Sequence, residues 1–152
     1  MDNATVAENL GSLVQLDIDA VHAYDQAIKR IEVSTVREQL VRFRGDHERH
    51  ITELSDYIRS IGEEPPEYSR DFKGFLIEGF TAIRSSTGTE GALKAMKSNE
   101  QKTNKDYNEA LSWELPAEAR TIVQRNYDDE RRHLRYVEQC LDQCVWETAS
   151  AR

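Results

Sequence analysis

Carboxylates and histidines recur in this chain at a fixed interval of 83 positions. The segment DHERH at residues 46–50 returns as DERRH at residues 129–133. The same interval relates Asp17 to Glu100 and Tyr24 to Tyr107. Oxygen and imidazole nitrogen donors of these kinds suit iron or manganese, and zinc also accepts them. The repeat therefore predicts a metal site built from two related halves.

The spacing of the apolar residues places these side chains on the inward faces of helices. His47 and His50 are three positions apart, as are Glu130 and His133, and residues three apart are neighbours on a helix surface. Asp17 interrupts an apolar stripe four positions after Leu13, and Glu100 interrupts the stripe of a later helix in the same way. Each of four predicted helices thus carries an ionisable residue into the core.

Burying isolated charges costs several kcal/mol each unless something compensates them. Two divalent cations would compensate the three carboxylates and three imidazoles of the predicted site. The candidate metal ligands are Asp17, His47, His50, Glu100, Glu130 and His133. The alternative is a buried network without metal, in which the carboxylates pair with the histidines or with Arg44 or Arg49.

The elements that must position these residues read as two copies of one helical hairpin, so the predicted fold class is all-α. The first hairpin spans about residues 5–61, a long crossover spans 62–88, and the second hairpin spans about 89–148. Ser34, Thr35 and Glu38 predict a cap for the second helix, and Thr89 predicts a cap for the third long helix. Gly62 and the prolines at 65 and 66 predict the end of the second helix.

The crossover has an apolar pattern of its own, which predicts a short helix within it. This helix could cover the bundle within the chain or meet another subunit. The apolar residues of the pattern are Phe72, Phe75, Leu76, Phe80 and Ile83.

Composition limits the function classes. The 152 residues, 38% of them apolar and 32% charged, suit one domain over residues 1–152 made of long amphipathic helices. A net charge of −8 without a basic cluster argues against nucleic acid as a partner. No apolar run approaches the length of a membrane span and no signal segment is visible, so we expect a cytoplasmic protein, as a monomer or small homo-oligomer. Cys140 and Cys144 are expected to be core thiols.

This pattern resembles the ferritin-like superfamily, in particular bacterioferritin and rubrerythrin, and it is also similar to small bacterial ferritin-like proteins of undefined function. In that superfamily two helices each give a Glu and two others each give Glu-x-x-His to a pair of metal ions. Glu130 and His133 match the second Glu-x-x-His, Glu100 matches the Glu of the third helix, and Asp17 stands where the Glu of the first helix would be. The resemblance covers nearly the whole chain and implies a ferritin-like four-helix bundle.

The resemblance also implies roles for residues beside the ligands. Asp46 and Asp129, each just before a ligand position, resemble bacterioferritin acids that bind the ligand histidine of the opposite helix. Tyr24 resembles a bacterioferritin tyrosine beside the metals. His47 departs from the pattern, because it occupies the place of a bridging Glu and one imidazole cannot bridge two ions as a carboxylate does. Two iron ions are expected, and one ion is the alternative.

Two functions follow from these expectations. The first is a ferroxidase, or an oxidase that consumes oxygen or peroxide, in which Tyr24 or Tyr107 orders a ligand or relays an electron. The second is a helical module without catalytic activity, with or without metal, that serves storage, sensing or protein interaction. The His at position 47 is the feature that favours the second.

Overall fold

The computed structural model describes residues 1–67 and 88–150. Four long helices and one short helix account for most of them, and these residues contain no strand. The helices are α1 (Asn3–Arg30), α2 (Ser34–Ser60), α4 (Gly88–Ala110), α5 (Ala117–Asp142) and α6 (Val145–Ser150). The short helix predicted in the crossover, with its apolar residues between 72 and 83, lies outside the described residues.

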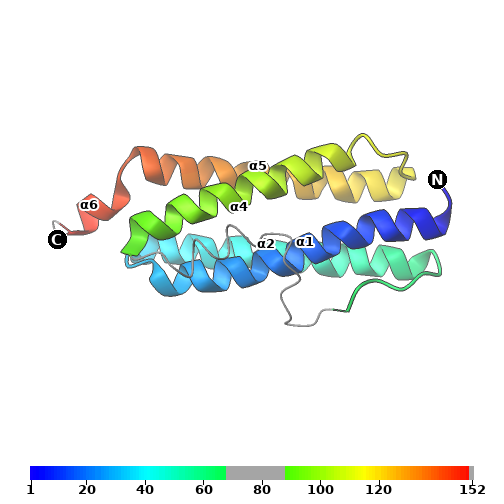
Figure 1. Ribbon diagram of the computed structural model, residues 1–152, viewed down its shortest axis with the longest axis horizontal. Coiled ribbons are helices and arrows are strands. Elements are labelled where there is room, and N and C mark those ends of the chain that lie inside the picture. Colours follow the sequence, from blue (N-terminus) through cyan, green and yellow to red (C-terminus); the bar gives the residue numbers. More distant parts are fainter. Residues whose placement is uncertain (68–87, 151–152) are drawn as a thin grey trace.

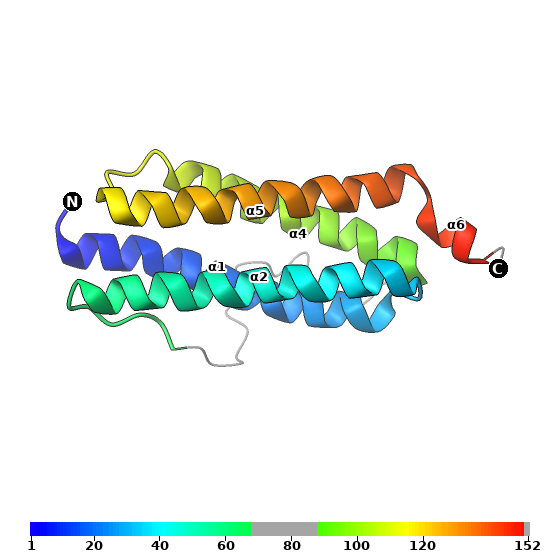
Figure 2. The same ribbon diagram turned by 180° about the vertical axis from the view of Figure 1, so that it is seen from behind.

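The four long helices form a bundle of two hairpins, which confirms the predicted all-α fold (Figure 1). α1 packs along α2 and α4 packs along α5, while α1 also contacts α4 and α2 contacts α5 across the bundle. α2 ends at one end of the bundle and α4 begins at the other, as the opposite view also shows (Figure 2). The end of the first hairpin and the start of the second therefore lie at opposite ends of the bundle.

The ends of the helices show where the local sequence signals apply. Asp2 caps α1, since its carboxylate accepts a hydrogen bond of 2.8 Å from the backbone N–H of Thr5. Gly62 has a φ of +83°, a left-handed conformation that favours glycine, and it follows the end of α2 as predicted.

Two predicted caps are wrong. The N-cap of α2 is Val33, which has no side-chain cap hydrogen bond, so Ser34 and Thr35 do not form the expected capping box. Thr89 lies inside α4, and its hydroxyl accepts a hydrogen bond of 2.8 Å from the backbone N–H of Glu32. Thr89 thus ties the start of α4 to the turn between α1 and α2, a tertiary contact that no local pattern reveals.

Two apolar clusters lie along the bundle, one on each side of its polar centre. The first contains Leu13, Leu54 and Ile58, and the second contains Leu40, Leu93 and Val137. Each fully buried aliphatic side chain contributes about 1.5–3 kcal/mol to folding, so these clusters can support a buried polar layer between them.

The structure also bears on two smaller expectations. Cys140 is buried in the second apolar cluster and Cys144 is half-buried, and both are free thiols. Within the described ranges, no helix is both long and apolar enough to cross a membrane.

Candidate metal centre

The six predicted ligands meet in the middle of the bundle. Asp17 comes from α1, His47 and His50 from α2, Glu100 from α4, and Glu130 and His133 from α5, and none of the six is more than 1% exposed. Their donor atoms form two groups, in each of which all the atoms lie within 4.8 Å of one another. We call Asp17, His47, His50 and Glu130 the Asp17 cluster, and His47, Glu100, Glu130 and His133 the Glu100 cluster.

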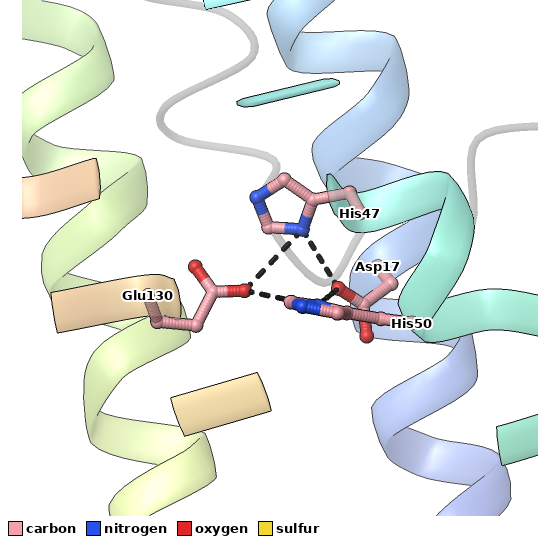
Figure 3. Close-up of side chains that lie close together, drawn as sticks. All are labelled: Asp17, His47, His50 and Glu130. Carbon is pink, nitrogen blue, oxygen red and sulfur yellow. Dashed lines mark hydrogen bonds and ion pairs between the residues drawn. The ribbon is translucent and has the colours of Figure 1, made fainter. Parts of the chain in front are cut away.

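The Asp17 cluster is held by hydrogen bonds to Asp17 (Figure 3). Asp17 Oδ1 lies 2.7 Å from His47 Nδ1 and 3.1 Å from His50 Nδ1. Glu130 Oε1 approaches from the other side, 3.3 Å from His47 Nδ1 and 3.6 Å from His50 Nδ1. One carboxylate oxygen of Asp17 thus joins both histidines of α2.

The Glu100 cluster is more open. His47 Nε2 lies 3.9 Å from Glu100 Oε1, and His133 Nδ1 lies 3.9 Å from Glu100 Oε2. His133 Nδ1 is 3.5 Å from Glu130 Oε2. His47 and Glu130 belong to both clusters, so their side chains separate two adjacent positions at which a cation could bind.

A carboxylate from the opposite hairpin holds the outer nitrogen of each terminal histidine. His133 Nε2 lies 2.8 Å from Asp46 Oδ2, and His50 Nε2 lies 2.9 Å from Asp129 Oδ2. These are the two contacts that the resemblance implied. Because a carboxylate only accepts hydrogen bonds, Nε2 carries hydrogen in both rings and Nδ1 is left to face the centre.

Two arginines at the surface complete this symmetric arrangement. Arg132 donates to Asp46 over 2.8 Å, and Arg49 donates to Asp129. Arg132 follows Arg49 by 83 positions, so the ion pairs obey the interval of the repeat. Arg44, the other arginine considered as a partner for the core carboxylates, instead pairs with Asp25 over 2.6 Å.

The two predicted tyrosines lie against the carboxylates of the opposite hairpin. The Tyr107 hydroxyl donates a hydrogen bond of 2.5 Å to Asp17 Oδ2, and the Tyr24 hydroxyl donates to Glu100 Oε1. Burial and the adjacent carboxylate raise the pKa of each phenol well above its ordinary value, so both remain protonated donors.

The electrostatics of the site follow from these contacts. Burial alone would lower the pKa of His50, but the charges of Asp17 and the hydrogen bond to Asp129 raise it to about 9. Burial raises the pKa of Asp129, yet its hydrogen bond and charge interaction with His50 lower it to about 2. Without a cation, His50 is therefore charged at neutral pH and stabilises its acidic neighbours.

The donor set fits a divalent metal ion. Among the described residues, four buried side-chain nitrogens or oxygens have no hydrogen-bond partner, and three of these are candidate ligand atoms: His47 Nε2, His133 Nδ1 and Glu130 Oε1. A buried polar atom without a partner costs about 1–3 kcal/mol. Binding a cation at these atoms would remove that cost, so the buried Asp, Glu and His residues could hold a metal ion.

A comparison with known protein families matches residues 5–113 to a family described as "Domain of unknown function (DUF2383)". The match covers more than two thirds of the chain. The chain belongs to the DUF2383 family. Neither the curated proteins nor the solved structures contain a significant match.

The DUF2383 match includes α1, α2 and α4 and ends before α5. Asp17, His47, His50 and Glu100 therefore lie within the matched region, whereas Glu130 and His133 lie beyond it. In this chain α5 supplies the residues that complete both clusters.

Three residues support the site without having been assigned a role from the sequence. Thr103 donates a hydrogen bond of 3.1 Å to Glu130 Oε2, and the Asn126 amide lies 3.4 Å from the Tyr107 hydroxyl. Phe43 packs on the His133 ring with centroids 4.2 Å apart. Thr103 and Asn126 are polar residues that interrupt predicted apolar stripes, and this interruption could have indicated a role in the site. No signal distinguishes Phe43 from other core residues.

Proposed function

We propose that this DUF2383 protein is a single-domain, ferritin-like metalloprotein that binds iron in its core and oxidises Fe²⁺ with dioxygen or peroxide. The observation that carries the proposal is the set of buried, unpartnered ligand atoms at the centre of the bundle. The carboxylates of Asp46 and Asp129 support it, because metal-binding histidines usually donate their second N–H to a carboxylate or carbonyl.

The ligand types suit iron without excluding other divalent metals. A site that mixes carboxylate oxygens with imidazole nitrogens and lacks thiolates suits iron or manganese, and it also accepts zinc. Glu100, Glu130 and Asp17 give three negative charges, which favours a divalent cation over a neutral ligand. Availability in the cell would then select among these metals.

Iron bound here would supply the electrons, two Fe²⁺ giving one electron each to convert hydrogen peroxide and two protons into two water molecules. The residues of the chain provide the surroundings for that chemistry. Asp46 and Asp129 fix the orientation of His133 and His50. Tyr24 and Tyr107 hold protons next to the carboxylates, and the apolar clusters on both sides exclude bulk water.

A second candidate is a metal-binding protein without oxidase activity. Position 47 favours it, because His47 takes the place that corresponds to Glu130 in the repeat. A carboxylate at both positions could bridge two ions, whereas His47 directs its two nitrogens into different clusters. Such a protein would store, buffer or sense a metal.

Anaerobic titration with Fe²⁺ followed by air separates the two candidates. We expect bound Fe²⁺ to be oxidised faster than free Fe²⁺ in the same buffer, with oxygen uptake and a near-ultraviolet ferric absorption. Tyr57→Phe serves as a control variant that should behave like the parent protein, because Tyr57 lies in the first apolar cluster and not among the site residues. Bound iron that oxidises no faster than free iron would eliminate the oxidase and leave the binding protein.

A further inference from the structure

We propose that the two clusters are unequal: the Glu100 cluster binds the first divalent cation, and Asp17 is a positioning residue for His47 instead of a ligand to that ion. This inference rests on the metal binding proposed above and specifies where it begins. It departs from the symmetric pair of ions that the repeat suggests.

The direction of the His47 ring favours the Glu100 cluster as the first site. Its Nδ1 is hydrogen-bonded to Asp17 over 2.7 Å, which leaves Nε2 as the nitrogen that can bind a cation. Nε2 points into the Glu100 cluster and has no hydrogen-bond partner. Asp17 thus stands to His47 as Asp46 stands to His133, where Nε2 is bonded to the carboxylate and Nδ1 is unpartnered. Both unpartnered imidazole nitrogens belong to the Glu100 cluster.

The donor atoms of the two clusters are also spaced differently. Ligands about 2.1 Å from a tetrahedral ion lie about 3.4 Å from each other, and neighbours around an octahedral ion lie about 3.0 Å apart. Three donor pairs in the Glu100 cluster are 3.5–3.9 Å apart, somewhat wider than these values, and no hydrogen bond joins the atoms of these pairs. Asp17 Oδ1 and His47 Nδ1 lie 2.7 Å apart, which is a hydrogen-bond distance, so the proton between them would have to leave before both atoms could bind one ion.

Most polar atoms of the Asp17 cluster already have hydrogen-bond partners within the protein. Asp17 Oδ1 joins His47 and His50, and Asp17 Oδ2 accepts from Tyr107 over 2.5 Å. His50 uses both ring nitrogens, one for Asp17 and the other for Asp129. Glu130 Oε1 is the one unpartnered ligand atom on this side. A cation would have to break the Asp17 hydrogen bonds to enter, so its binding must be weaker.

The charges of the Glu100 cluster are consistent with its binding the first cation. Glu100 and Glu130 are both buried, and two carboxylates balance one divalent cation in a low-dielectric interior. His47 and His133 complete the set as neutral ligands. We therefore expect a tight site with two histidines and two glutamates, next to a second site that fills at a higher cation concentration.

The experiment is a calorimetric titration of the full chain with Zn²⁺, which needs no redox step. We expect one ion per chain to bind at least about tenfold more tightly than a second. Glu100→Gln should weaken the first ion at least about tenfold. Asp17→Asn should weaken it less than Asp17→Ala does, because the Asn carbonyl still accepts a hydrogen bond from His47.

Ring ¹⁵N chemical shifts of the histidines give an independent readout that needs no variant. The first equivalent of Zn²⁺ should shift the nitrogens of His47 and His133 while those of His50 stay in place. Two ions of equal affinity, or a shift of His50 together with His133, would overturn the inference and leave the proposed metal binding intact. No bound Zn²⁺ in the unmodified protein would overturn both.

Discussion

Replacing Asp46 and Asp129 in turn by Ala gives a matched test of the site, because the two residues occupy equivalent positions in the repeat. Asp46 binds His133 over 2.8 Å, and Asp129 binds His50 over 2.9 Å. Each also pairs with a surface arginine, so the loss of ion pairing affects both variants. The variants differ in which cluster loses an oriented histidine.

Removing the carboxylate behind a ligand histidine typically weakens metal binding by about 10–100-fold, which corresponds to roughly 1.4–2.7 kcal/mol. Asp46→Ala should have this effect on the first bound ion, since His133 belongs to the Glu100 cluster. Asp129→Ala should change the affinity of that ion by less than about threefold, because His50 belongs to the Asp17 cluster. The assay is competition for Zn²⁺ against a chromophoric chelator.

Circular dichroism provides the control, because both variants should keep the helical spectrum of the parent. Equal losses of affinity in the two variants would refute the unequal clusters. No loss in either variant would refute the orienting role of the two aspartates.

Three further predictions concern stability and stoichiometry. In the metal-free protein, the raised pKa of His50 adds stability that is complete below pH 6.5 and is lost as pH rises through about 9. The lowered pKa of Asp129 adds stability that is present above about pH 4 and is lost as pH falls toward 2. Urea unfolding across this range, with a maximum between about pH 4 and 6.5, checks both signs. His47→Glu should bring the affinities of the two ions closer together, because two carboxylates at positions 47 and 130 can bridge them; a calorimetric titration in which the second ion still binds at least about tenfold more weakly would contradict this. Leu54→Ala should cost about 2–5 kcal/mol in urea unfolding without changing the number of ions bound, since Leu54 lies in the first apolar cluster.

The repeat made much of the architecture predictable. Long amphipathic stripes indicate helices directly. The interval of 83 residues that separates Tyr24 from Tyr107, and His50 from His133, indicates that these residues occupy equivalent positions along the two hairpins. Contacts such as Asp46 with His133 were expected from a resemblance, not from spacing, because they join residues 87 positions apart. The structure brings all six predicted ligands within two overlapping clusters.

Other features depend on tertiary contacts and could not be predicted from the sequence. The hydroxyl of Thr89 looked like a helix cap, but it binds the backbone of Glu32, because the turn between α1 and α2 lies beside the start of α4. The sequence also could not show which nitrogen of His47 faces which cluster. That choice depends on the hydrogen bond to Asp17, which exists only once α1 and α2 have packed together.

The claim that the core binds a metal is tested most directly at Glu130, which belongs to both clusters. Equilibrium dialysis against Fe²⁺ without oxygen, followed by elemental analysis, measures iron per chain in the parent protein and in Glu130→Gln. The account predicts at least one iron per parent chain and a loss of at least about tenfold in affinity in the variant. Equal iron contents in the two proteins, or no iron in the parent, would contradict it.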